Sequence, residues 1–157
     1  MAKSKLTDKA AGLIVVEFDY DGDHFVDTDS NLSVEELTPE AVRGALNRAP
    51  AKYAYWAGIL AKINDELRKQ EDSFEFWKAP KYKSISEENP KATETYKNTQ
   101  VMLDNIKEFK LKKQELNELT FAAAKCGILV KAYEMQSRTL QSVGSLFRTE
   151  MELSGND

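Results

Sequence analysis

The stretch YAYWAGILAKINDELRKQEDSFEFW, residues 53–77, repeats apolar side chains at intervals of seven residues. Its eight seam positions are Tyr53, Leu60, Leu67 and Phe74 in one row and Trp56, Ile63, Gln70 and Trp77 in the other, and all except Gln70 are apolar. A seam of this kind is typical of a helix that packs along another helix. The sequence therefore predicts a mainly α fold, in which long amphipathic helices form a helical hairpin or bundle.

Proline and capping residues predict where the first helices begin and end. Thr38 is placed to cap a helix whose first residue is Pro39, and this helix is expected to run to about Asn47. Pro50 then either kinks the helix or begins the next one. The run KAPKYKS, residues 78–84, is expected to end the long helix.

A second long helical segment is expected after Asn89, with Asn89 as its cap and Pro90 as its first residue. Its first stripe is Tyr96, Thr99, Leu103 and Ile106. The later stripe has Leu116, Ala123 and Val130 alternating with Leu119, Cys126, Tyr133, Leu140 and Phe147. The phase shift predicts a stutter or a break near residues 110–115 and leaves open whether one bent helix or two are present.

Self-association is expected, because helices of this length rarely bury both stripes within so small a chain. The positions assigned to it are Leu119, Tyr133, Leu140 and Phe147. The predicted organisation is an acidic arm over residues 1–37, a helical oligomerisation and DNA-binding domain over 38–151, and a frayed tail over 152–157.

The acidic arm contains DYDGDHFVDTDSN, residues 19–31, which invites comparison with a calcium-binding loop. An EF-hand needs glycine at its sixth position and glutamate at its twelfth, and no frame of this stretch supplies both. The segments 13–20 and 24–28 instead alternate apolar and polar residues around Asp21 and Gly22, a hairpin turn signal. We expect a short acidic β-hairpin or extended arm that leans on another element, since two strands alone are marginally stable.

The composition argues against an enzyme. With one histidine and one cysteine, most zinc sites and histidine- or cysteine-based catalytic sets are excluded within one chain. We expect no cofactor and no metal, with His24 facing solvent on a strand and Cys126 in the core. The lone cysteine and the absence of a long apolar run predict a cytoplasmic protein without a membrane span.

The charges are unevenly distributed. Residues 1–40 carry a net charge of −7 and residues 41–148 a net charge of +6, which is typical of a polyanion-binding body with an acidic segment. The candidate DNA-binding residues are Trp77, Lys78, Lys81, Tyr82 and Lys83, together with Arg68 and Lys69. Lysines attract phosphate, and aromatic rings stack on unpaired bases. Alternatively, Trp77 and Tyr82 pack within the bundle and the lysines are merely solvated.

The order of these features resembles the UvsY family of phage recombination mediators. The likeness lies in DHFVDT (23–28), the aromatic helix APAKYAYWAGILAKINDELRK (49–69), the basic linker, and GILVKAYEMQSRTLQSV (127–143) with Arg148. Lys78 and Lys81 stand at about the family's distance from Trp56. The resemblance implies a ring-forming protein of an infected bacterial host, without enzymatic activity.

Such a protein binds single-stranded DNA and helps load a RecA-like recombinase onto strands coated by a single-strand-binding protein. The acidic arm would then compete with phosphate for the lysines, or dock on the recombinase or the single-strand-binding protein. Two alternatives remain open from the residues: a helical structural or adaptor protein of a phage without DNA binding, and an acidic inhibitor of a host nuclease.

Overall fold

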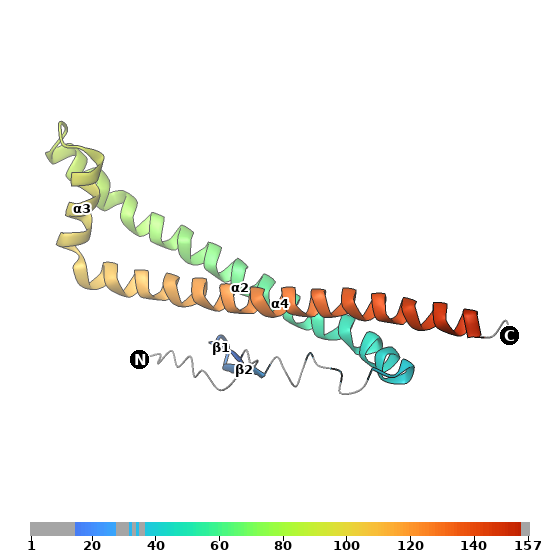
Figure 1. Cartoon of the computed structure of the whole chain (residues 1–157). Coiled ribbons are helices and arrows are strands. Elements are labelled where there is room, and N and C mark those ends of the chain that lie inside the picture. Colours follow the sequence, from blue (N-terminus) through green and yellow to red (C-terminus); the bar gives the residue numbers. More distant parts are fainter. Residues whose placement is uncertain (1–14, 28–31, 33, 35–36, 155–157) are drawn as a thin grey trace. The chain divides into compact units, whose positions relative to one another are not determined.

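The computed structural model describes residues 15–27, 32, 34 and 37–154. The described chain is mainly α, with the order β1 (Val15–Asp19), β2 (Asp23–Asp27), α2 (Pro39–Glu88), α3 (Glu94–Asp104) and α4 (Ile106–Ser154) (Figure 1). The long helices α2 and α4 pack as a helical hairpin, as the heptad pattern predicts. The chain divides into two compact units: unit 1 is Met1–Leu60 with Ala124–Asp157, and unit 2 is Ala61–Ala123.

The strands β1 and β2 form the predicted antiparallel hairpin in unit 1. Its register pairs Val16 with Val26 and Phe18 with His24. Asp21 and Gly22 both adopt positive φ angles, of 51° and 116°, which aspartate tolerates and glycine favours. The side chains of Val16, Phe18 and Val26 are buried on one face. The β-hairpin packs against α2, as expected: the centroids of the Phe18 and Trp56 rings are 6.1 Å apart.

Helix α2 begins where the sequence predicts, but it ends later. The backbone N–H of Ala41 donates to Thr38 Oγ1 at 3.2 Å, so Thr38 is the cap. The expected end near Asn47 and the expected end within residues 78–84 are both wrong, because α2 runs through Pro50 and Pro80 to Glu88. Each proline removes one helical hydrogen bond. Burial of Ala49 and of Ile85 beyond the second proline offsets that loss.

Helix α3 differs from the prediction at both ends. Thr93 caps it, since its Oγ1 accepts from the Tyr96 backbone N–H at 3.2 Å, so the assignment of Asn89 as a cap is wrong. The carbonyl of Asn89 instead accepts from the Ala92 N–H in a turn. The chain breaks at Asn105, not within 110–115, so two separate helices follow α2.

The stripe predicted for α3 is not its buried face. Tyr96 and Leu103 are exposed, as is Ile106 at the start of α4, whereas Val101 is buried. Helix α3 therefore packs through the Val101 side. At the other end of the chain, α4 includes residues 152–154, which the sequence assigns to a frayed tail; residues 155–157 lie outside the described chain.

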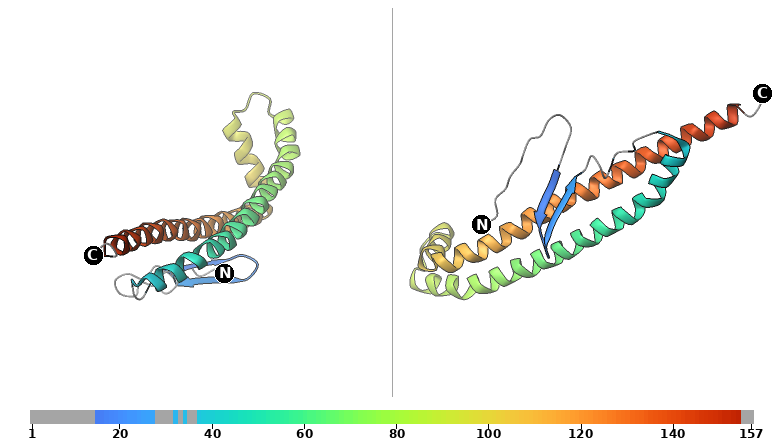
Figure 2. Two further views of the ribbon diagram at one scale, coloured as in Figure 1. Left: turned by 90° about the vertical axis from the view of Figure 1, so that its right-hand side faces the viewer. Right: turned by 90° about the horizontal axis from the view of Figure 1, so that it is seen from below.

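In unit 1 the segments of α2 and α4 lie side by side and run antiparallel (Figure 2). A Cβ atom added to Gly144 would lie 3.5 Å from Leu46 Cδ1. Further along, the Cys126 thiol donates to the Trp56 carbonyl at 3.4 Å. As the residue number increases along α2, the residues that it contacts on α4 have decreasing numbers, so the two helices are antiparallel. Cys126 and Leu129 are fully buried, so the prediction of a core cysteine is confirmed.

The predicted seams are largely the buried faces of the two long helices. Trp56, Ile63 and Phe74 are buried on α2, while Tyr53 is an exception because it is exposed. On α4 the buried members are Leu116, Cys126, Tyr133 and Leu140. No helix in the described part of the chain combines the length and the apolar character needed to cross a membrane.

Candidate nucleic-acid interface

Unit 2 is built around three aromatic rings from α2 and α4. The Phe74 and Trp77 rings stack with centroids 5.6 Å apart, and the Phe109 ring lies 5.7 Å from Phe74 and 6.3 Å from Trp77. The spacing of Phe74 and Trp77, three residues apart, turns both rings toward α4. Trp77 therefore packs in the helix pair, as the heptad pattern places it.

Lysine side chains cover this aromatic cluster. Lys81 Nζ lies 4.9 Å from the Trp77 ring centroid and 3.8 Å from a Glu108 carboxylate oxygen. Lys113 Nζ lies 4.7 Å from the Phe74 centroid. The Trp77 ring is thus flanked by Phe74 and by the Lys81 ammonium group. This packing does not leave the ring open as a platform for an unpaired base.

The other predicted contact residues are on or near the surface, and several are paired with carboxylates. Arg68 and Lys69 both contact Asp65, at 3.0 and 2.6 Å. The hydrogen bond and the charge of Lys69 hold the pKa of Asp65 below its usual value, with Arg68 adding to the effect. Lys83 Nζ lies 3.9 Å from Glu87. Exposed pairs of this kind contribute about 0–1 kcal/mol and exchange readily for other partners.

The remaining two predicted residues, Lys78 and Tyr82, are half-buried. The structure therefore does not gather all seven predicted residues into one open patch. It separates a packed aromatic cluster from a surrounding set of lysines.

Sequence analysis did not assign a functional role to two exposed rings in the same stretch of the chain as these lysines. Phe76 is 81% exposed and Tyr96 is 49% exposed. Phe76 directly precedes Trp77, so about 100° of helix rotation separates the two side chains. The signal was present in the heptad register, which assigns the inward position to Trp77 and leaves Phe76 outside it.

We call residues 76–113 the basic segment, because they hold nine lysines against five carboxylates. They comprise the end of α2, helix α3 and the start of α4, all within unit 2. The exposed lysines are Lys83, Lys91, Lys107, Lys110 and Lys113. Exposed cations with exposed aromatic rings can hold a phosphate chain and stack its bases.

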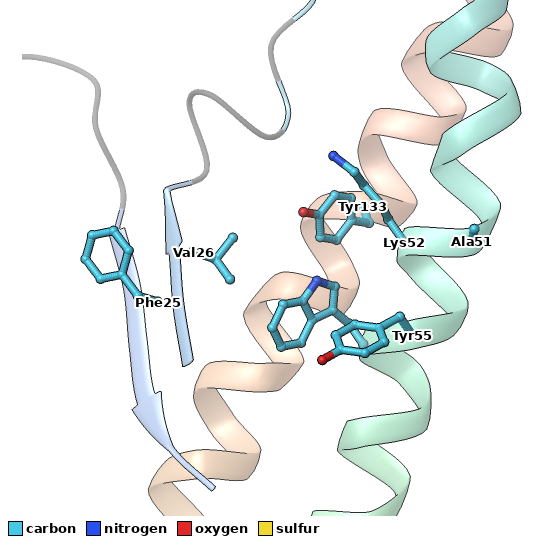
Figure 3. A pocket seen from close by; sticks show the side chains of 7 residues that line it. Phe25, Val26, Ala51, Lys52, Tyr55 and Tyr133 are labelled. Carbon is cyan, nitrogen blue, oxygen red and sulfur yellow. The ribbon is translucent and has the colours of Figure 1, made fainter. Parts of the chain in front are cut away.

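Unit 1 contains a second candidate, an open hollow of about 460 Å³. Its lining residues are Phe25 and Val26 from β2, Ala51, Lys52, Tyr55 and Trp56 from α2, and Tyr133 from α4. Figure 3 shows that Val26 points toward the helices, whereas the Phe25 ring points away. Among the described lining residues, Lys52 alone is charged, and its Nζ lies 5.7 Å from the Tyr133 ring centroid. Aromatic walls of this kind suit binding better than acid–base chemistry.

The titratable groups behind this hollow, Tyr133, Cys126 and His24, pack against other side chains. Burial raises the pKa of Tyr133, an effect partly offset by a hydrogen bond with Trp56. Burial raises the pKa of the Cys126 thiol to about 11, so the reactive thiolate is scarce at neutral pH. The expectation of a solvent-facing His24 is wrong. Its ring is half-buried, stacks on Phe18 at 5.0 Å and hydrogen bonds the Tyr20 carbonyl at 2.8 Å.

Within the described ranges, no group of three or more histidine, cysteine or acidic side chains is arranged to hold a metal ion. Part of the acidic stretch 19–31, namely residues 28–31, lies outside those ranges.

The four residues assigned to self-association face the interior to different degrees. Tyr133 and Leu140 are buried within the chain itself, and Leu119 and Phe147 are half-buried. Their apolar side chains therefore pack mainly within the helical hairpin of α2 and α4.

A scan against protein-family models and searches of curated proteins and of solved structures found no match. The functional argument accordingly depends on the geometry of the basic segment and on the order of features in the sequence.

Proposed function

We propose that this chain is a non-enzymatic, self-associating protein that binds single-stranded DNA and acts as a recombination mediator. In this role it helps load a RecA-like recombinase onto strands coated by a single-strand-binding protein. The resemblance to the UvsY family supplies the mediator role. The observation that carries DNA binding is the basic segment of unit 2, with its exposed Phe76 and Tyr96.

The chemistry of the basic segment suits a flexible strand. Lysine ammonium groups attract phosphates without reading sequence, and each contact releases counterions. A phenyl or phenol ring stacks on any base, contributing about 1–3 kcal/mol per base. Phe76 replaces Trp77 as the proposed stacking ring, because Trp77 is packed against Phe74 and Phe109.

Each chain offers only a few such contacts, and acidic side chains lie among them. Self-association multiplies these contacts, because a strand held by one subunit meets the next at high effective concentration. A ring of subunits would therefore bind strongly and yet lose the strand readily when salt rises or a competitor arrives. A mediator needs this behaviour, since it must yield the strand to the recombinase.

The experiment is a titration of fluorescently labelled oligothymidine with the full chain at about 50 and 200 mM salt, read by anisotropy. We expect affinity to fall by orders of magnitude across this range. Phe76→Ala should weaken binding about tenfold at both salt concentrations. Lys107→Ala with Lys110→Ala should weaken binding and reduce the salt slope by about 1.4, because about 0.7 is lost per phosphate contact on a single strand.

Two matched variants serve as controls. Arg43→Ala with Arg148→Ala removes two exposed cations from unit 1 and should leave the affinity unchanged. Trp77→Phe keeps the packed ring and should also bind as the wild type does. No binding at 50 mM salt would refute the proposal. DNA binding without faster recombinase assembly on a coated strand would refute the mediator role alone.

A second candidate, a helical structural or adaptor protein of a phage, is favoured by the exposed apolar side chains along α4, such as Leu111, Met135 and Leu146. In that case these side chains serve protein contacts and the lysines are inert. The same titration separates the two functions, since an adaptor would self-associate without binding the strand.

A further inference from the structure

Helix α4 carries a second apolar stripe in unit 1, distinct from the face that packs on α2. Ile128, Met135, Leu146 and Leu153 are 48–70% exposed. Their separations of 7, 11 and 7 residues place them on one side of the helix. Cys126, Leu129, Tyr133 and Leu140, which are buried, lie about a third of a turn away. Helix α4 therefore presents one occupied face and one open apolar face.

The positions between these four side chains complete a heptad pattern without any charge. They are Ala132, Thr139, Ser142 and Thr149. The Ser142 hydroxyl donates to the Arg138 carbonyl at 3.1 Å, and the Thr149 hydroxyl donates to the Ser145 carbonyl at 3.2 Å. Because both hydroxyls are already bonded within the helix, covering them with another helix leaves no donor unpaired.

We propose that this stripe binds the same stripe of a second copy of the chain, antiparallel and about a two-fold axis between Thr139 and Ser142. The inference deepens the proposed function, on which it rests for its biological role, by specifying one contact of the self-association that avidity requires. A two-fold contact closes a dimer, so a ring would be built from such dimers through a second surface. A two-fold contact is self-complementary, so each residue must meet a suitable partner when the stripe is reversed.

The reversed stripe meets this requirement along its length. Ile128 comes opposite Leu153, and Met135 comes opposite Leu146, so that apolar side chains face each other. Thr139 comes opposite Ser142 at the axis. Ala132 comes opposite Thr149, so the seam contains no charged side chain.

Charge at the edge of the stripe favours the antiparallel direction. Lys131 and Glu152 both directly precede seam positions, and both are exposed. In an antiparallel helix pair, a residue at such a flanking position of one helix contacts a residue at the equivalent flanking position of the other helix. Lys131 of one copy then lies beside Glu152 of the other, twice by symmetry. A parallel, in-register pair would instead bring Lys131 beside Gln136 and form no such ion pair.

The first test is the native mass of the full chain without DNA, measured by light scattering over about 1–100 μM. We expect the wild type to have the mass of two chains or a multiple of two. Met135→Lys with Leu146→Lys places four ammonium groups in the proposed seam. This double variant should raise the dissociation constant at least about a hundredfold, with unchanged helical circular dichroism. An unchanged mass would overturn the proposal.

A charge reversal tests the direction of pairing. Lys131→Glu should weaken association about tenfold by facing Glu152, and Lys131→Glu with Glu152→Lys should restore it. Arg148→Glu is the matched control, because it makes the same charge change on α4. Although Arg148 precedes Thr149, it lies one turn after Gly144, whose position faces Leu46 of α2, and so on the side of α4 away from the stripe. Failure of the double reversal to restore association would overturn the antiparallel arrangement.

A wild type that stays monomeric at 100 μM would also overturn the proposal, leaving the stripe to a helix of another protein. Because these masses are measured without DNA, loss of association and loss of strand binding can be told apart. A dimer that binds no strand refutes the proposed function while the pairing stands.

Discussion

The two units use their tryptophans in different ways. In unit 1, Trp56 is buried against Phe18 and His24, and its carbonyl accepts from Cys126. In unit 2, Trp77 is half-buried, with the Lys81 ammonium group beside its ring. The Trp77 indole N–H has no hydrogen-bond partner among the described residues. Unit 1 thus packs its tryptophan against other core rings, whereas unit 2 packs its tryptophan beside a lysine ammonium group.

This contrast suggests a division of labour. A tryptophan packed against other core rings is expected to be insensitive to salt. A tryptophan packed beside a lysine keeps positive charge close to the surface, at the cost of weaker packing. Under the proposed function, unit 1 would hold the assembly together and unit 2 would contact the anionic strand.

The largest expected difference is between truncations of the two tryptophans. Trp56→Ala should lower the free energy of unfolding by about 3–5 kcal/mol, because it removes a buried ring and leaves a cavity. Trp77→Ala should cost about 2 kcal/mol, since less surface is buried and an unpaired donor is removed. Urea denaturation followed by circular dichroism measures both. Equal losses would contradict the contrast between the units.

Alkaline pH should destabilise the protein through unit 1. The unfolded thiol of Cys126 ionises near pH 9, whereas burial raises its folded pKa to about 11. A raised pKa stabilises the fold below pH 9, and this stabilisation is lost as the pH rises toward 11. The expected loss is about 2–3 kcal/mol. Urea midpoints measured from pH 8 to 11 give this slope.

The Cys126→Ala variant is the control for the pH dependence. It should show a shallower decline over the same range, although its stability at pH 8 will be lower. Tyr133, whose pKa is also raised by burial, adds a decline in the same direction that both proteins share. Parallel slopes in the two proteins would contradict the role of the thiol.

Removing the cap of α2 and removing the cap of α3 should affect different amounts of the structure. Thr38→Ala removes the cap of α2 and should cost about 1 kcal/mol of global stability. Thr93→Ala removes the cap of α3, an 11-residue helix whose buried side chain is Val101. We expect faster amide hydrogen exchange confined to α3, with a smaller change in the urea midpoint. A global loss as large as that of Thr38→Ala would show that α3 is integral to the fold.

The smallest effect is expected for Lys81. Lys81→Met removes an ammonium group from the Trp77 ring and from Glu108, and should cost no more than about 1 kcal/mol at low salt. The difference from the wild type should shrink at 1 M salt, where exposed charges are screened. A loss that is unaffected by salt would indicate that packing of the lysine stem dominates.

Local signals account for the parts of the fold that the sequence predicts correctly. Asp21 and Gly22 specify the hairpin turn, and Thr38 with Pro39 specifies the start of α2. Each of these features depends on a few neighbouring residues. The heptad register likewise assigns Trp77 to the packed face, and the cluster with Phe109 confirms that assignment.

The failures arise where distant residues decide the outcome. Pro80 ends a helix in isolation, yet α2 continues because Ile85 is buried beyond it. Asn89 and Thr93 are both good caps, and only the path of α3 selects Thr93. The interface residues shifted for a different reason. Phe76 and Trp77 are adjacent and chemically alike, and the assignment of Trp77 to the interface conflicts with the heptad register, which places Trp77 inward.

The continuation of α2 across Pro80 has a consequence for local opening. Proline has no N–H, so the carbonyl of Phe76 cannot accept the usual bond from four residues ahead. A 50-residue helix therefore has a gap in its backbone ladder beside the exposed ring proposed to stack on DNA. One turn of helix can open there at a lower free energy than its neighbours. If the chain binds DNA as proposed, local opening of this turn would let the Phe76 ring follow a bent strand without unfolding of the whole helix.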